Sequence, residues 1–362
     1  GGVGGGGVGG GVGGGGVGGG VGGGVGGGTG GGVGGGTGGG VGGGGVGGGT
    51  GGGAGGGGAS FTFGTASIVG ATPGTSDEIV ALEGGLGGVW ALSSGSQVFR
   101  SMGAAFTSLF DMPGEGKDLF LAGNTVVLVQ GRAIRRCPPS FNCTTDTAYD
   151  TFDLLSPNND FAEGVCGTAA DDVWVVGTTG SNDGVLYHFD GNQWQAVDRN
   201  LPVRYAKDCW FDGSGAMYIA GERGVVRYAG GSATFEQVTT TTTQFYKGFS
   251  TSTDTWVVGA DFKIARRTGP GAWTVVNMPT SNAASLWTVG GPAANELFAL
   301  GGVNSLAPGG YRWNGAQWTA SPTALPGLPI NSTVRAIFSA SLNEVYFGGG
   351  SASGLVIVKG VR

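Results

Sequence analysis

The chain has 362 residues, of which 87 are glycine, and its 18 basic and 24 acidic residues leave a net charge of −6. This acidic balance argues against a nucleic-acid partner, because such a partner requires a basic surface to neutralise its phosphates. With one histidine and no apolar run of about 18 residues, the chain is expected to hold no metal or other cofactor and no membrane span.

The first 58 residues form a low-complexity segment. It contains 45 glycines and 13 other residues, whereas every charged, aromatic, cysteine and proline residue lies later in the chain. Nine of the twelve steps between the 13 residues are four and three are five. This period excludes collagen, and an α-helix is disfavoured because each glycine costs about 1 kcal/mol relative to alanine. The 13 residues are Val3, Val8, Val12, Val17, Val21, Val25, Thr29, Val33, Thr37, Val41, Val46, Thr50 and Ala54.

Two ordered conformations remain for this segment. In a threefold polyglycine II helix, successive side chains point to three sides in turn, whereas a β-strand would place residues 17–41 in one row. Ordering 58 residues costs about 60–120 kcal/mol, which 13 small side chains cannot offset at about 1.5–3 kcal/mol each. An ordered segment therefore requires hydrogen bonds to neighbouring copies. We predict that residues 1–58 are an assembly segment of the polyglycine II type, with a flexible linker as the alternative.

Residues 59–362 have the composition of an ordinary globular domain and open with an alternating strand at residues 60–69. Repeats then follow in which an acid or Asn precedes an apolar run, a glycine and an aromatic strand, as in residues 172–177 and 254–259. A degenerate copy lies at residues 125–131. The second-strand aromatics of the other copies recur with a mean spacing of about 43 residues. They are Trp90, Trp174, Tyr218, Trp256, Phe298 and Tyr346.

Four short strands in each repeat are typical of a β-propeller blade, so the fold class is predicted to be an all-β, seven-bladed β-propeller. The last repeat stops before a fourth strand. We therefore expect residues 60–69 to supply the outermost strand of the last blade and close the ring. The predicted blades span residues 77–110, 117–155, 161–198, 205–240, 245–278, 284–320 and 333–362.

Four cysteines allow three pairings, and their spacing favours one of them. Cys137 and Cys143 flank two prolines across a short loop, and Cys166 and Cys209 lie one repeat apart on predicted innermost strands. Two disulfides would indicate an oxidising compartment, and four buried free thiols are the alternative. The chain begins without methionine, so either a leader has been removed or the sequence starts within a longer protein, and the cysteines favour the first explanation, an exported protein.

Several residues are candidates for chemistry. His188 and Asp190 lie on one face of a strand and could orient a base, but no nucleophile motif accompanies them. A solvent-facing strand residue is the preferred interpretation of His188. Residues 114–118 resemble a phosphate loop that lacks its first glycine and its Ser or Thr, so they are interpreted as a tight turn. The arginines interpreted as surface charge are Arg132, Arg135, Arg136, Arg266 and Arg267.

Aromatic residues recur on the predicted fourth strands, where they could stack on sugars or pack between blades, and packing is preferred. They are Trp194, Phe235, Trp273 and Trp318. Asn142 and Asn331 lie in N-glycosylation sequons. The five threonines at residues 239–243 could carry O-linked sugar or simply form a β-branched strand or loop.

The repeats resemble those of bacterial secreted β-propellers of the kelch, WD40 and Asp-box types, over about residues 60–362. The closest motif is Asp190–Trp194, which is one residue short of an Asp-box and lacks its serine. The Gly-His and Trp-Asp pairs of WD40 repeats are missing. The resemblance implies a propeller architecture and assigns no catalytic residues.

Two functions fit this sequence. The first is a structural subunit of an extracellular filament or surface fibre, with self as the partner and with propellers decorating a core of glycine segments. The second is a secreted adhesin or carbohydrate-binding propeller that recognises surface glycans from a flexible glycine stalk. No acid–base pair suited to catalysis is identifiable, so we expect no enzyme activity.

Overall fold

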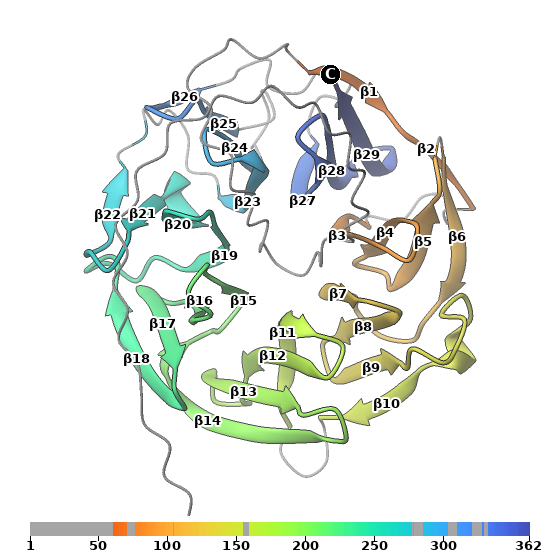
Figure 1. The fold of residues 1–362 in the computed structure, drawn as a ribbon, viewed down its shortest axis with the longest axis horizontal. Helices are drawn as coiled ribbons and strands as arrows, with labels where there is room; N and C mark the ends of the chain where they lie inside the picture. Colours follow the sequence, from red (N-terminus) through yellow and green to blue (C-terminus); the bar gives the residue numbers. More distant parts are fainter. Residues whose placement is uncertain are drawn as a thin grey trace, which may run out of the picture. The chain divides into compact units, whose positions relative to one another are not determined.

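The computed structural model describes residues 61–70, 77–103, 105–154, 159–276, 278, 285–302, 310–320, 328 and 332–362. The chain divides into two units, residues 1–39 and 40–362, and every described residue lies in the second. The described strands form seven sheets in a ring around a common centre (Figure 1). The predicted all-β, seven-bladed propeller is therefore confirmed.

Each blade is a sheet whose first strand lies innermost. Blade 1 contains β3 (Ile79–Gly85), β4 (Gly88–Ser93), β5 (Gln97–Ser101) and β6 (Ala105–Asp111). Blade 2 contains β7 (Asp118–Ala122), β8 (Thr125–Gln130), β9 (Ala133–Cys137) and β10 (Asp150–Asp153), with the 3-10 turn Asp146–Ala148 before β10. Blade 3 contains β11 (Phe161–Ala169), β12 (Asp172–Thr178), β13 (Asp183–Phe189) and β14 (Trp194–Arg204).

The remaining blades repeat this order. Blade 4 contains β15 (Asp208–Phe211), β16 (Met217–Gly221), β17 (Gly224–Ala229) and β18 (Ser232–Gln237). Blade 5 contains β19 (Phe245–Ser250), β20 (Asp254–Gly259), β21 (Ile264–Thr268) and β22 (Thr274–Val276), with the 3-10 turn Ala260–Phe262 after β20. Blade 6 contains β23 (Leu286–Ala293), β24 (Glu296–Gly301), β25 (Gly310–Trp313) and β26 (Trp318–Ala320). Blade 7 contains β27 (Thr333–Ser341), β28 (Glu344–Ser351) and β29 (Gly354–Val361).

Two short strands at the start of the described chain close the ring. β1 (Thr62–Thr65) pairs antiparallel with β29 as the outermost strand of blade 7, as predicted. The prediction of one continuous strand over residues 60–69 is wrong, because the strand is interrupted at Ala66. The Ala66 N–H makes the last hydrogen bond to β29, to the Ile357 carbonyl at 2.8 Å. β2 (Ser67–Val69) then pairs in parallel with β6 of blade 1. One straight strand cannot follow the edges of two blades set at an angle, so the segment bends and joins them.

Phe63 anchors this closure. Its ring centroid lies 5.8 Å from that of Phe347, and its edge covers Gly360, where an added Cβ would meet the ring at 2.5 Å. We expect Phe63→Ala to lower the free energy of unfolding by about 2 kcal/mol, because a half-buried aromatic side chain contributes less than a fully buried one. Denaturant unfolding measures this loss. The control is Phe141→Ala, since Phe141 is 58% exposed; equal losses in both variants would contradict the anchoring role.

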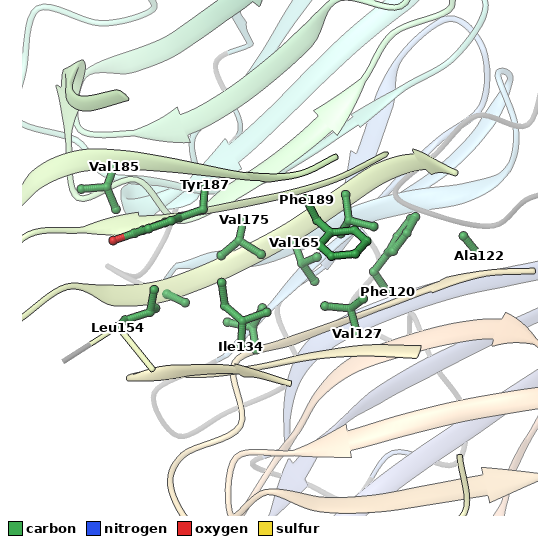
Figure 2. Close-up of a cluster of buried hydrophobic side chains, with 13 residues drawn as sticks. Phe120, Ala122, Val127, Ile134, Leu154, Val165, Val175, Val185, Tyr187 and Phe189 are labelled. Atoms are coloured by element: carbon green, nitrogen blue, oxygen red, sulfur yellow. The ribbon is translucent and has the colours of Figure 1, made fainter. Parts of the chain in front are cut away.

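The hydrophobic core lies between the blades, with one buried cluster at each of the seven interfaces. Figure 2 shows the cluster between blades 2 and 3, where side chains of the two facing sheets interdigitate. The second strands are therefore covered by a neighbouring blade on each face, which explains why their sequences are continuously apolar instead of alternating between apolar and polar residues. Residues contributing from the two sides include Phe120, Val127, Ile134, Val165, Val175 and Phe189.

The innermost strands approach one another closely because an aromatic ring in one blade lies against a glycine in the next. A Cβ added at Gly248 of β19 would lie 2.3 Å from the Trp210 ring of β15. A Cβ added at Gly84 of β3 would lie 2.1 Å from the Phe338 ring of β27. Any larger residue at these positions would have to displace a ring, so glycine is required for the observed spacing.

Candidate functional site

Three ionisable side chains from separate blades meet at the centre of the ring. Lys247 Nζ of β19 lies 2.9 Å from Asp208 Oδ1 of β15 and 3.2 Å from Asp118 Oδ2 of β7. Asp208 and Asp118 are 2% and 6% exposed, whereas the Lys247 side chain retains 32% of its exposure. We call these residues the central ion cluster. It connects blades 2, 4 and 5 across the ring.

Backbone groups hold the two carboxylates in place. The Gly248 N–H donates to Asp208 Oδ2 at 3.0 Å, and the Val165 N–H donates to Asp118 Oδ2 at 3.1 Å. Burial raises the pKa of Asp208 to about 6, although the positive charge of Lys247 opposes this shift. Burial would lower the pKa of Lys247, but the two carboxylates outweigh it and raise that pKa, so Lys247 is charged at neutral pH.

The innermost strands all begin on one face of the ring, which we call the mouth face, and an aromatic and charged group lies there. The ring centroids of Tyr246 in blade 5 and Trp287 in blade 6 are 4.3 Å apart. The Arg335 guanidinium lies 3.8 Å from the Trp287 ring centroid and 2.6 Å from a carboxylate oxygen of Glu78. Tyr246, Trp287 and Arg335 form a stack that crosses blades 5, 6 and 7, and Glu78 connects it to blade 1. Aromatic rings beside a cation are suited to binding a ligand rather than to converting it chemically.

The mouth face between blades 3 and 4 carries a second ion pair and a shallow cavity. Lys207 Nζ lies 2.9 Å from Glu163 Oε1. Nearer the rim, the cavity has a volume of about 430 Å³ and combines an apolar floor with charged walls. Its lining residues are Leu201, Pro202, Val203, Arg204, Glu222, Arg223 and Phe235.

His188 lies in a different environment from the one expected. Its ring stacks on Trp174 at a centroid distance of 3.9 Å, and its Nε2 lies 2.8 Å from Asp172 Oδ1. The predicted partner Asp190 instead accepts the N–H groups of the turn that follows it, including that of Asn192 at 2.9 Å. Asp172 is the better partner because it starts the strand that pairs directly with the strand of His188. The side chain is 25% exposed, so the solvent-facing interpretation is only partly right.

This stack is one copy of an arrangement that recurs around the ring. In every blade, a basic third-strand residue lies opposite the second-strand position that holds the recurring aromatic residue, or Val127 in the degenerate copy. The seven opposed pairs are Trp90–Arg100, Val127–Arg136, Trp174–His188, Tyr218–Arg227, Trp256–Arg266, Phe298–Arg312 and Tyr346–Lys359. In blades 3, 5, 6 and 7 the acid that begins the second strand bonds this base. These charges therefore stabilise single blades and do not converge on one pocket.

The arginines singled out in the sequence are dispersed in the same way. Arg132 and Arg136 lie over aromatic rings of the next blade, and Arg266 binds the acid of its own blade. The surface-charge interpretation is wrong for Arg135 and Arg267, whose side chains are 13% and 12% exposed. Each packs beside a carboxylate, which compensates the cost of partial burial.

The outer-strand aromatics pack between blades, as predicted. The ring of Trp194 in blade 3 lies 6.3 Å from that of Phe152 in blade 2. Trp273 and Trp318 likewise contact aromatic rings of the preceding blade, and Phe235 packs against the cluster between blades 3 and 4. Trp194, Trp273 and Trp318 are therefore engaged in packing between blades, whereas Phe235 also lines the shallow cavity.

Both predicted disulfides are present. Cys137 pairs with Cys143 and Cys166 with Cys209, at Cα–Cα distances of 5.8 and 5.6 Å. The second bond joins the innermost strands of blades 3 and 4, and the alternative of four free thiols is wrong. Two disulfides are consistent with a secreted or extracellular protein.

The two disulfides should differ in their effect on stability. Replacing Cys166 and Cys209 together with alanine is expected to lower the free energy of unfolding by about 4 kcal/mol, because the bond closes a long loop. The same change at Cys137 and Cys143 is expected to cost about 2 kcal/mol, since that loop is short. Denaturant unfolding of the two double variants under identical conditions compares them. A larger loss at the short loop would contradict the loop-length explanation.

Other predicted positions are only partly described. Asn142 is exposed in the loop that the first disulfide closes, whereas Asn331 lies outside the described residues. The thirteen assembly residues, Val3 through Ala54, also lie outside them. The threonines at 239–243 form a loop, in which the Oγ1 atoms of Thr239 and Thr241 are 2.9 Å apart. Within the described ranges there is no helix that could cross a membrane and no His, Cys, Asp or Glu cluster suited to a metal.

Comparison with known proteins supports the architecture. No protein-family model and no curated protein matches the chain. Solved structures that resemble it include YCF48 from Cyanidioschyzon merolae, with a TM-score of 0.60 at 13% identity over 83% of this chain and 98% of that one. Another is a catalytically inactive histidine variant of virginiamycin B lyase from Staphylococcus aureus with quinupristin, with a TM-score of 0.65 at 14% identity over 83% and 99%. At such identities the likeness establishes the fold alone.

A third similar structure is the WD40 propeller domain of Doa1, with a TM-score of 0.60 at 10% identity over 83% of this chain and 97% of that domain. The three similar proteins include an enzyme and propellers without a stated reaction. The central ion cluster and the mouth-face stack were not found from sequence, because their members are far apart along the chain. The only signal in the sequence was an aspartate at the start of two innermost strands, Asp118 and Asp208.

Proposed function

We propose that the chain is a structural subunit of an extracellular filament or surface fibre, in which glycine segments of different copies pack together. The observation that carries this proposal is a 58-residue segment with 45 glycines and no charged or aromatic side chain. Such a segment gains almost nothing from apolar burial, so its order depends on dense backbone hydrogen bonding between chains. The propeller is then the folded part that each copy carries.

The attachment of the segment to the propeller supports this arrangement. The chain enters the propeller at Phe61, directly before β1, which is the outermost strand of blade 7. The Arg362 guanidinium lies 4.1 Å from the Phe61 ring centroid and also binds Glu296 of blade 6. This contact holds the first described residue, Phe61, beside the outermost strand of blade 7.

An extracellular location follows from the same proposal. The two disulfides support export to an oxidising compartment. We expect no enzyme activity, because Lys247 binds the central carboxylates and, in four blades, the acid that begins the second strand binds the base of its own blade.

Assembly of the full chain tests this function. We expect concentration-dependent fibres in electron micrographs, with a rise of about 3.1 Å per residue in fibre diffraction for polyglycine II or about 3.4 Å for a sheet. Replacing Gly22, Gly23 and Gly24 with glutamine should abolish the fibres, because the added side chains separate the backbones. The control carries glutamine at Gly103 and Gly213, where a Cβ meets no atom within 4 Å. A wild-type chain that stays monomeric at high concentration would remove the proposal.

The mouth-face stack favours a second candidate function, a binding propeller. The half-buried Trp287 and Tyr246 rings, beside the Arg335 guanidinium, offer the aromatic and cationic contacts that surface glycans or peptides use. A structurally similar protein, YCF48, has been solved bound to the D1 peptide. A glycan array with wild type and Trp287→Ala tests this candidate. Retention that is equal for both proteins would exclude the stack as the site.

A further inference from the structure

The central ion cluster holds the reactants of an amide bond next to each other. Lys247 carries a primary amine, and its Nζ lies 2.9 Å from a carboxyl oxygen of Asp208. The second carboxylate, Asp118, lies 3.2 Å from the same nitrogen. The Asp208 and Asp118 side chains are almost completely shielded from solvent. An amine, a carboxyl group and a neighbouring proton acceptor are the three groups that an intramolecular condensation requires.

We propose that Lys247 and Asp208 condense into an intramolecular amide cross-link between blades 4 and 5, with Asp118 as the proton acceptor. In this reaction, the Lys247 Nζ forms a bond to Cγ of Asp208, and the bond from Cγ to one carboxyl oxygen breaks. The ammonium begins with three protons. One remains on the amide nitrogen and two leave with the departing oxygen as water, passed on by Asp118. No oxidant, cofactor or external reactant is needed.

The positions of the groups assign the roles. Asp208 is the electrophile because its carboxyl group lies nearer to the Lys247 Nζ. Burial also raises the pKa of this carboxyl group, so it is partly protonated and one of its oxygens can leave as water. Its other oxygen accepts the Gly248 N–H at 3.0 Å, and this donor would stabilise the negative oxygen of the tetrahedral intermediate. Asp118 accepts backbone N–H groups from Val165 and Leu119, which keep its oxygens oriented beside the amine.

The charged state of Lys247 slows this reaction but does not prevent it. A protonated amine is not a nucleophile, so the reaction starts from the minor state in which a proton has moved to a carboxylate. Holding the groups in contact supplies an effective concentration that reaches about 10⁵ M or more in well-oriented intramolecular reactions. The reaction also needs to occur only once in each molecule. A slow step during maturation is therefore sufficient to cross-link the population.

Intact mass spectrometry of the full chain, reduced and denatured, tests the proposal. The wild type is expected to be lighter than its sequence mass by about 18 Da, which corresponds to one water. Lys247→Arg keeps the positive charge but cannot form this amide, so it should show the full sequence mass. Asp208→Ala should also show the full mass. A wild-type protein of full sequence mass, after prolonged incubation at neutral pH, would overturn the proposal without any variant.

Peptide mapping identifies the bond. Trypsin should fail to cleave after Lys247, and the peptide that contains it should be joined to the peptide that begins at Asp208. A mass loss that maps to any other residue would overturn the assignment. Asp118→Asn removes the proton acceptor and is expected to slow the appearance of the cross-linked species at least about tenfold. An unchanged rate in that variant would contradict the role of Asp118.

Discussion

Replacing Gly248 with alanine is expected to lower the free energy of unfolding by about 3 kcal/mol, at the upper end of the usual cost of overpacking. The added Cβ would lie 2.3 Å from the ring of Trp210, which is 1% exposed and therefore has no space to move into. The ring is also held by its Nε1, which donates to Ser250 Oγ at 3.1 Å. Denaturant unfolding, compared with the wild type, measures the loss.

A matched control separates steric conflict from the loss of glycine flexibility. Gly213 has no atom within 4 Å of an added Cβ, so Gly213→Ala should change the free energy of unfolding by no more than about 0.5 kcal/mol. The double variant Gly248→Ala with Trp210→Leu should recover part of the loss, because the smaller side chain makes room for the methyl group. If the double variant is less stable than the sum of its single changes, the assigned conflict between these residues is wrong.

Replacing Lys247 with methionine is expected to lower the free energy of unfolding by about 3 kcal/mol at pH 7.5, compared with wild type that has not yet formed the proposed cross-link. The change removes the cation between Asp118 and Asp208 and leaves two shielded carboxylates without a counter-charge, which typically costs about 3–5 kcal/mol. The lower figure applies because the Lys247 side chain is itself 32% exposed. The matched control is Lys263→Met, since Lys263 makes no ion pair with any described residue. Equal effects at the two lysines would contradict the account.

The loss in the Lys247 variant should depend on pH. Burial already raises the pKa of Asp208 to about 6, from 3.8, and removal of the lysine would raise it further. Between pH 4 and that higher value, the folded variant binds more protons than the unfolded chain, so its stability falls as pH rises. The variant should therefore recover stability on acidification from pH 7.5 to 5. Unfolding curves at both pH values check the sign, and a larger deficit at pH 5 would contradict it.

The repeat period was sufficient to predict the ring. Each second strand except the degenerate one carries a large aromatic residue, which is buried in five blades and half-buried at Trp174, so the recurrence of this residue along the chain counts the blades. The incomplete last repeat likewise required a strand from elsewhere, and β1 fills that place. The disulfide between Cys166 and Cys209 was predictable for the same reason, because residues one period apart occupy equivalent places on neighbouring blades.

The spacing of residues along one strand gave the wrong contact where the true partner lies on another strand. His188 and Asp190 share a strand face, but the turn after the strand engages Asp190, and the cross-strand neighbour Asp172 takes its place. The extension of the closing segment into β2 was also missed, because three residues in parallel pairing with β6 carry no alternating pattern of their own. In both cases the deciding contact came from another strand.

The amino-acid sequence by itself determined the fold class, the number of blades, the disulfide pairing and the separate character of the first 58 residues. These properties follow from composition and from a constant repeat, which act locally and can be recognised one segment at a time. Only the tertiary structure brought Asp118, Asp208 and Lys247 together, across as many as 129 residues of chain. Closing a ring sets which innermost strands face one another, and no spacing along a linear chain encodes that relation.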